Sequence, residues 1–198
     1  AIDLEPKNAT RHSRMVHHLC APWDPRYRDL EQALKHAQRA VELAPTDCKS
    51  YEALGYAHEF AGRQQEAIAA FQAANRLSNG GHLVALANVY MNGGDDEQAF
   101  DILRQLVRSP NPDPKVFLYL SRIHSRRGEY DMALDASNKA VELVSRPNAK
   151  SWLGPNSLTA FEFFEQRGRV HLALNDLPSA LKDFDRAVEL APFIGRLR

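Results

Sequence analysis

The sequence predicts an all-α protein, a solenoid of about five stacked helix pairs. Three observations predict this fold. The heptapeptide RAVELAP occurs twice, at 39–45 and 186–192. Both copies place apolar residues at helical spacing and then end at Ala-Pro, where proline stops a helix. The third observation is a period of about 34 residues between similar runs, which is the signature of stacked repeats.

The period is measured between alanines that begin the pattern A-x3-[F/L/A/S]-x2-[A/L]. Their intervals are 34, 32, 34 and 47 residues, so the last interval is one period plus thirteen residues. We therefore expect an insertion at 148–160, between the fourth and fifth repeats. The alanines that define the period are Ala33, Ala67, Ala99, Ala133 and Ala180.

Each period contains two amphipathic helices, and residues 48–79 display them best. Tyr51 and Leu54 begin an apolar stripe at three- and four-residue spacing, as a helix requires. Gly62 is placed to end this helix in a left-handed conformation. Ala67 and Phe71 then mark a second helix. Neither helix can bury its stripe alone, so we expect the repeats to stack.

Five repeats form a single predicted array over the whole chain. The first repeat is divergent in its first half, although its second helix is evident from Leu30 to Leu43. Residues 1–6 look like the last turn of an earlier repeat, and the final FIGRLR lacks a polar capping helix. We therefore expect the chain to be a piece of a longer protein. The repeats are expected at 9–47, 48–79, 80–113, 114–147 and 161–194.

This pattern resembles the tetratricopeptide repeat family, whose 34-residue signature is W-x2-L-G-x2-Y, then A-x3-F, then P. Residues 48–79 match it best, through Tyr51, Leu54, Gly55, Ala67 and Phe71. The resemblance recurs in all five repeats. The resemblance implies a right-handed α-α superhelical solenoid of about five such helix pairs. It also implies a concave groove, lined chiefly by positions 2, 5, 9, 12 and 13 of each first helix, that takes a peptide or helix of a partner protein.

These groove positions carry acids in the second repeat, amides in the third and arginines in the fourth. An extended peptide with a basic end and an acidic end would fit them. Arg122 and Arg126 suit bidentate hydrogen bonds to a carboxylate or phosphate, or they are ordinary solvated charges. The predicted groove residues are Lys49, Glu52, Tyr56, Glu59, Asn88, Asn92, Arg122, Arg126, Glu165 and Arg169. The same positions also hold Phe60, Val84, Met91, Lys115, Leu118, Ser125 and Glu162.

Composition and motifs argue against several other functions. Lys plus Arg equals 25 and Asp plus Glu equals 25, and this net charge of zero argues against a nucleic-acid partner. No apolar run approaches the roughly 20 residues of a membrane span. No catalytic or cofactor-binding motif occurs, and two cysteines do not make a disulfide scaffold. We therefore expect no catalytic residue and no cofactor.

Three histidines, His58, His124 and His171, share one repeat position. A row of metal ligands is one interpretation of them. Helices stack about 10 Å apart, whereas zinc ligands lie about 2.1 Å from the metal, so packing residues between helices are favoured. We expect no metal site.

The predicted function is non-catalytic protein–protein interaction through the groove. Two alternatives remain open. The chain is a structural scaffold whose copies self-associate as a homo-oligomer, or it is a regulatory region attached to an enzyme domain elsewhere in the parent chain. In the insertion, Trp152 and Leu153 either fold back onto the repeats or contact a partner or another copy. The composition favours a cytoplasmic setting.

Overall fold

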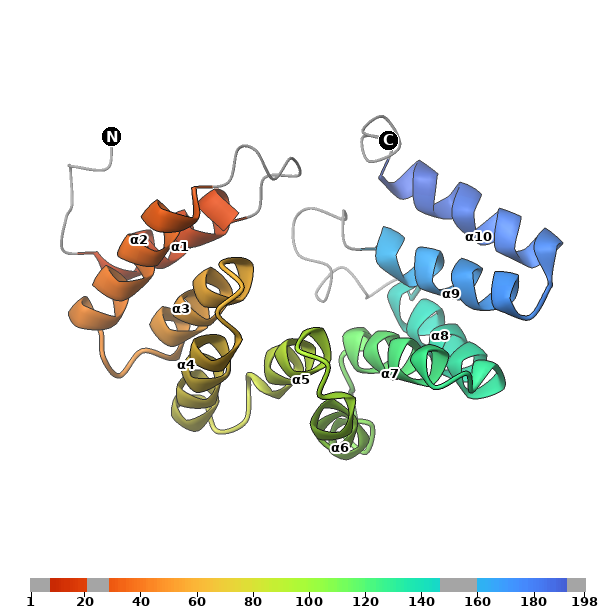
Figure 1. Cartoon of the computed structure of the whole chain (residues 1–198), viewed down its shortest axis with the longest axis horizontal. Helices are drawn as coiled ribbons and strands as arrows, with labels where there is room; N and C mark the ends of the chain where they lie inside the picture. The colour runs from red at the N-terminus through yellow and green to blue at the C-terminus, as the bar shows by residue number, and fades with distance from the viewer. Residues whose placement is uncertain (1–7, 21–28, 147–159, 192–198) are drawn as a thin grey trace. The chain divides into compact units, whose positions relative to one another are not determined.

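A computed structural model describes residues 8–20, 29–146 and 160–191. Within these ranges the chain forms ten helices and no strand, which confirms the predicted all-α helical repeat (Figure 1). The chain divides into two compact units, Ala1–Asp95 and Asp96–Arg198. The helices are α1 (Ala9–Cys20), α2 (Leu30–Leu43), α3 (Cys48–Phe60), α4 (Gln64–Leu77), α5 (Leu83–Asn92), α6 (Asp96–Leu106), α7 (Pro114–Arg126), α8 (Tyr130–Val144), α9 (Phe161–Ala173) and α10 (Leu177–Leu190).

The first unit is built from antiparallel helix pairs. Helix α1 packs against α2, α3 packs against α4, and α3 also contacts both α1 and α2. Helix α5 then packs against α4. Small side chains dominate the core, so the helix axes approach closely. One buried cluster, formed by α1, α2 and α3, consists of Val16, Cys20, Ala33, Ala37, Ala53 and Ala57, and Cys20 is a free thiol.

The second unit repeats this arrangement. Helix α7 pairs with α8, α9 pairs with α10, and α9 contacts both α7 and α8. The buried side chain of Gln166 connects α9 with α7. Its amide donates to the hydroxyls of Ser121 and Ser125 of α7, 3.2 Å away in each case. Helix α6 packs against α7.

The helix ends follow from local sequence. Gly62 has a φ of 71°, as predicted, and turns the chain from α3 into α4. Asp47 and Asp113 precede α3 and α7, and the carboxylate of each accepts the backbone N–H of the residue two positions later. These bonds satisfy N–H groups that have no partner inside the helix.

A glycine on the first helix allows the second helix of its pair to approach closely. A Cβ atom on Gly55 would lie 2.7–2.8 Å from ring atoms of Phe71, which is fully buried. In the fifth predicted repeat, Gly168 and Phe184 show the same relation, with a nearest distance of 2.9 Å. A large ring thus occupies the space that the missing side chain leaves.

Some of the sequence predictions fall outside the described residues. Trp152 and Leu153 of the predicted insertion lie there, so the two alternatives for them stay open. The division into five repeats also stays a prediction, and the border between the two units lies inside the predicted repeat 80–113. Among the described helices, none is long and apolar enough to cross a membrane.

We expect Gly55→Ala to destabilise the first unit by about 1–3 kcal/mol, since the added methyl group overpacks the Phe71 ring. Helix propensity alone would have the opposite sign, because alanine in a helix is favoured over glycine by about 1 kcal/mol. Urea unfolding followed by circular dichroism measures the change. The double variant G55A/F71L should recover part of the loss. A single variant as stable as the parent would contradict the close approach.

Candidate partner-binding surface

The predicted groove residues of the first unit meet across consecutive first helices. Glu59 of α3 accepts hydrogen bonds through Oε1 from the side-chain amides of Asn88 (2.9 Å) and Asn92 (2.8 Å) of α5. Burial raises the pKa of Glu59, and the hydrogen bond from Asn92 opposes that shift. The acid of the second repeat and the amides of the third therefore form one polar cluster.

The other predicted residues of this unit line α3. Glu52 lies 3.5 Å from the imidazole Nε2 of His82, and Lys49 is exposed at the start of the helix. The Tyr56 ring contacts two other rings, His17 of α1 at 5.4 Å and Phe71 of α4 at 5.1 Å between centroids. Acidic, basic and aromatic groups are thus present on one helix, and Tyr56 is already held by ring contacts.

In the second unit, the two predicted arginines already form ion pairs with carboxylates of the chain itself. Arg122 of α7 donates to Glu162 of α9 at 3.0 Å, and its guanidinium lies 5.8 Å from the centre of the Tyr119 ring. Arg126 donates to Asp96 of α6 at 2.6 Å. An acidic ligand would have to displace these carboxylates from the guanidinium groups.

Arg169 and Glu165 form an ion pair with each other along α9, with a nitrogen–oxygen distance of 2.8 Å. Two residues at the remaining groove positions are not on the surface. Met91 and Leu118 are 1% and 2% exposed, so they belong to the core. Both side chains are apolar, and this property of the sequence could have indicated that they are buried.

Two of the three histidines at the shared repeat position, His124 and His171, contact side chains of neighbouring helices, as predicted. His124 is buried edge-on against Phe100, and its Nδ1 lies 2.5 Å from a carboxylate oxygen of Glu129. Burial lowers the pKa of His58. His171 is half-buried. Within the part of the chain that the structure describes, no group of three or more His, Cys, Asp or Glu side chains could hold a metal ion.

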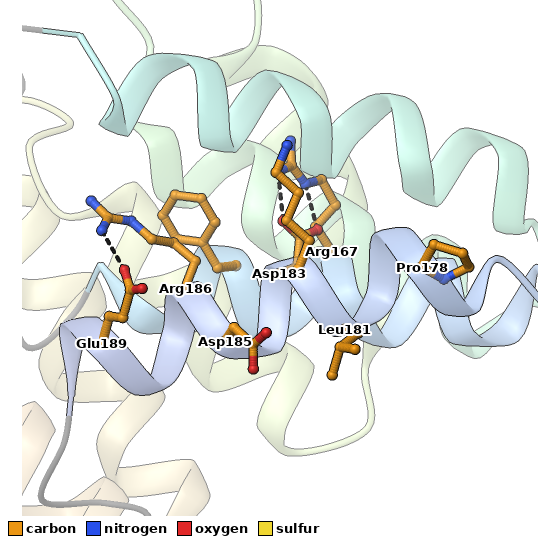
Figure 2. A pocket seen from close by; sticks show the side chains of 9 residues that line it. Arg167, Pro178, Leu181, Asp183, Asp185, Arg186 and Glu189 are labelled. Carbon is orange, nitrogen blue, oxygen red and sulfur yellow. Dashed lines mark hydrogen bonds and ion pairs between the residues drawn. The ribbon is translucent and has the colours of Figure 1, made fainter.

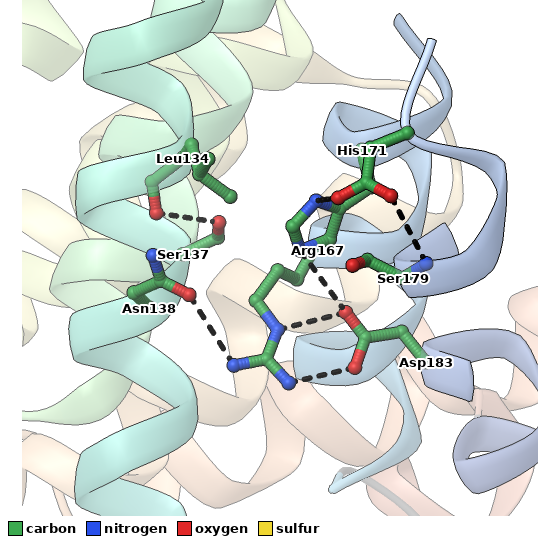
Figure 3. A network of polar contacts seen from close by, with 8 residues as sticks. Leu134, Ser137, Asn138, Arg167, His171, Ser179 and Asp183 are labelled. Carbon is green, nitrogen blue, oxygen red and sulfur yellow. Dashed lines mark hydrogen bonds and ion pairs between the residues drawn. The ribbon is translucent and has the colours of Figure 1, made fainter. Parts of the chain in front are cut away.

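Sequence reasoning missed a polar network between α8, α9 and α10 (Figure 3). Arg167 donates through Nε and Nη2 to both oxygens of Asp183, at 2.8 and 2.6 Å. The Asp183 side chain is only 4% exposed. Arg167 also donates to Asn138 of α8 at 3.3 Å, and His171 lies at the edge of the same network. The bidentate geometry compensates part of the desolvation of both charges.

A signal for this network was present in the repeats. Arg167 occupies the position that holds Leu54 in the second repeat and Leu120 in the fourth, and Asp183 stands where those repeats have alanine. A matched pair of departures, one basic and one acidic, indicates a buried ion pair in place of an apolar contact.

An open depression of about 570 Å³ lies beside α10 (Figure 2). Phe164 and Arg167 of α9 line it together with residues of α10. Leu181 and Asp185 point to one side of α10, away from the Arg167–Asp183 pair. The surface around this depression therefore combines an apolar side chain with charged ones.

Comparison with known protein families identifies two matches. The tetratricopeptide repeat family matches residues 27–82, and a second tetratricopeptide repeat description matches residues 83–112. These adjoining matches include helices α2 to α6.

Several curated proteins are similar in sequence. The chain is 28% identical to anaphase-promoting complex subunit 3 of Schizosaccharomyces pombe over 83% of this chain and 23% of that protein. It is 26% identical to anaphase-promoting complex subunit CDC16 of Saccharomyces cerevisiae over 81% of this chain and 19% of that protein. It is 28% identical to the human protein O-mannosyl-transferase TMTC1 over 82% of this chain and 17% of that protein. The chain thus spans less than a quarter of each relative.

Solved structures share the fold. The APC/C hetero-tetramer Cut9-Hcn1 matches with a TM-score of 0.78 and 16% identity, over 96% of this chain and 35% of that one. A thermophilic TPR protein of Thermus thermophilus matches with a TM-score of 0.72 and 19% identity, over 94% of this chain and 93% of that one. YrrB, described as a TPR protein with an unusual peptide-binding site, matches with a TM-score of 0.52 and 20% identity, over 97% of this chain and 91% of that one.

We expect Arg167→Leu to destabilise the second unit by about 3 kcal/mol, because it leaves the buried Asp183 carboxylate without its partner. The double variant R167L/D183A restores the apolar pair of the second and fourth repeats and should fall within about 1 kcal/mol of the parent. R169L, which removes an exposed ion pair, should cost less than about 1 kcal/mol. Chemical unfolding measures all three. A double variant no more stable than R167L would contradict the assignment.

We expect Glu59→Gln to stabilise the protein at pH 7, because a neutral amide avoids the burial of charge that raises the pKa of Glu59, while its carbonyl still accepts from the two asparagines. A raised pKa makes the folded parent more stable as the pH falls. The difference should therefore disappear at about pH 4, below the ordinary glutamate pKa. Urea midpoints at both pH values test this, with exposed Glu31→Gln as control. A difference that persists at the lower pH would contradict it.

Proposed function

Because this chain belongs to the tetratricopeptide repeat family, we propose that it is a non-catalytic protein-interaction module. The first helices of its pairs would bind a peptide or helix of a partner protein. The family and the fold support the general role in protein–protein interaction, and the following arguments support this surface.

The observation that carries the proposal is the direct contact between groove positions of successive first helices. Glu59 at position 12 of α3 meets Asn88 and Asn92 at positions 9 and 13 of α5. Arg122 at position 9 of α7 meets Glu162 at position 2 of α9. In each unit, therefore, these side chains lie on one shared face, which is what a ligand that crosses several repeats requires.

These contacts also hold the side chains in place before a ligand arrives. Fixed side chains lose less conformational entropy on binding, which favours affinity. The ion pairs of Arg122 and Arg126 are partly exposed and weak, so an acidic partner can exchange with Glu162 and Asp96 at little cost. We propose that acidic groups of the partner bind the α7 arginines and that basic groups bind near Glu52.

The relatives favour a protein partner inside a larger assembly. Two of them are named as subunits of the anaphase-promoting complex, and a structural neighbour is an APC/C hetero-tetramer. Another neighbour is described as having a peptide-binding site. A second candidate function, a repeat region attached to an enzyme domain, draws support from the relative named as an O-mannosyl-transferase, of which this chain covers 17%.

We expect R122Q/R126Q to reduce partner capture at least fivefold while leaving stability within about 1 kcal/mol of the parent, since exposed ion pairs contribute little. Glutamine avoids the repulsion that glutamate would meet beside Glu162 and Asp96. Tagged chain is incubated with a lysate of the source cells, and the captured proteins are quantified by mass spectrometry. The melting temperature is measured in parallel.

The matched control is K139Q/R146Q on α8. It removes the same number of positive charges from exposed side chains, both paired with Glu142, outside the predicted groove positions. The control should capture the same proteins in the same amounts as the parent. Equal capture by both double variants would contradict the proposed surface, and equal loss in both would point to net charge instead.

A further inference from the structure

Glu59 is the acid at a predicted groove position that the chain itself does not match with a basic side chain. Within the described residues it forms no ion pair, and it receives only the hydrogen bonds from Asn88 and Asn92 of α5. The other acids at these positions each face a basic side chain of the chain. These pairs are Glu52 with His82, Glu162 with Arg122 and Glu165 with Arg169.

A half-buried carboxylate without a cation nearby is unfavourable for the folded chain. Burial raises the pKa of Glu59, and only the hydrogen bond from Asn92 opposes this shift. A glutamine would accept the same two hydrogen bonds without carrying a charge. The charge of Glu59 therefore contributes nothing to the fold that a neutral side chain could not, and a charge of this kind in a groove is typical of a ligand-binding site.

The hydrogen bonds around Glu59 leave several oxygen atoms available to a donor. An ionised carboxylate can only accept, so both asparagines turn their NH2 groups toward its Oε1 atom. Among the described residues, the second carboxylate oxygen and the side-chain carbonyl oxygens of Asn88 and Asn92 accept no hydrogen bond. Three acceptors, one of them charged, thus lie together, which suits a cation with several N–H donors.

Three arginines of this chain show how it binds a guanidinium group. Each forms an ion pair with a carboxylate and also lies beside an aromatic ring. Arg127 lies 2.7 Å from Glu97 and 4.6 Å from the centre of the Phe100 ring, and these two partners stand three residues apart on α6. The other two sets are Arg122 with Glu162 and Tyr119, and Arg167 with Asp183 and Phe164.

Helix α3 presents the same combination of a carboxylate and aromatic rings. Tyr56 stands three residues before Glu59, so the two side chains share one face of the helix. Phe60 follows Tyr56 by one helical turn and is 40% exposed. In the described part of the chain, this combination lacks the arginine that accompanies it elsewhere.

We propose that Glu59, Asn88 and Asn92 form a binding site for an arginine side chain of the partner protein, with the ring of Phe60 beside the guanidinium group. This inference rests on the proposed function, because the site belongs to the same groove, and it names the residue that the partner inserts there. Arginine suits the site better than lysine. Its planar guanidinium group presents five N–H donors in a fixed fork and stacks on aromatic rings, whereas an ammonium group is a compact point charge.

The test uses NMR spectroscopy of the ¹⁵N-labelled full chain and a capped pentapeptide that carries one arginine between serine and alanine residues. Binding through a single side chain should be weak, with a Kd of about 1–10 mM. The side-chain amide signals of Asn88 and Asn92 should shift in a saturable manner. The same peptide with lysine in place of arginine should bind at least threefold more weakly. Calcium chloride should not shift these signals, since calcium requires about six to eight oxygen ligands.

Glu59→Gln should weaken binding of the arginine peptide at least tenfold, because it removes the charge that the guanidinium group meets. This variant is expected to be more stable than the parent at pH 7, so a loss of binding would not reflect unfolding. The matched control is Glu31→Gln, which removes one carboxylate from an exposed position of α2, where Glu31 pairs with Lys35. The control should bind the peptide within twofold of the parent.

Four results would overturn the proposal. They are unchanged amide signals at about 20 mM arginine peptide, equal affinity for the arginine and lysine peptides, a Glu59→Gln variant that binds like the parent, and equal shifts with calcium chloride. The last result would assign the site to a metal cation. The proposed function is tested through the arginines of α7 in the second unit, and this site is tested through Glu59 in the first. Failure of one and failure of the other are therefore distinguishable.

Discussion

The close approach of the two helices in each pair is the constraint on which the rest of the structure depends. It requires a small residue on both sides of the contact. The alanine at the start of each second helix, from Ala33 to Ala180, is at most 3% exposed, and Gly55 and Gly168 leave room for a whole ring. Alanine itself buries little apolar area, so a pair gains most of its stability from larger side chains that the next pair covers. A helix pair is therefore stable only when the next pair stacks on it.

This dependence explains how far the sequence predicts the fold. Helix positions, the turn at Gly62 and the 34-residue period follow from local patterns, because a helix end or a small-residue contact is specified within a few residues. The division into two units does not follow, since it depends on how strongly successive pairs pack. Burial at groove positions was misjudged for the same reason. Met91 and Leu118 stand where a surface residue is expected, but neighbouring helices cover them.

The candidate site was predictable in its residue types and not in its pairings. Sequence position indicated that Glu59, Asn88 and Arg122 belong to first helices, but only the structure shows which side chains meet. The buried pair of Arg167 and Asp183 was missed because the search followed positions that keep the repeat pattern. A buried charge that loses its partner is strongly destabilising, whereas a leucine and an alanine can exchange with similar residues at modest cost. Departures from the repeat therefore carry information that agreement with it does not.

Helices α2 and α10 separate the contribution of a helix from that of its surroundings. Three apolar residues of α2 stand 147 positions before identical residues of α10, namely Leu30, Leu34 and Val41 before Leu177, Leu181 and Val188. These side chains are partly buried in α2 and more than half exposed in α10. Full burial of a leucine side chain is worth about 1.5–3 kcal/mol, so the same apolar residues contribute very different free energies in the two places. In a repeat protein, the free energy that a helix contributes therefore depends on the helices that pack against it as well as on its own sequence.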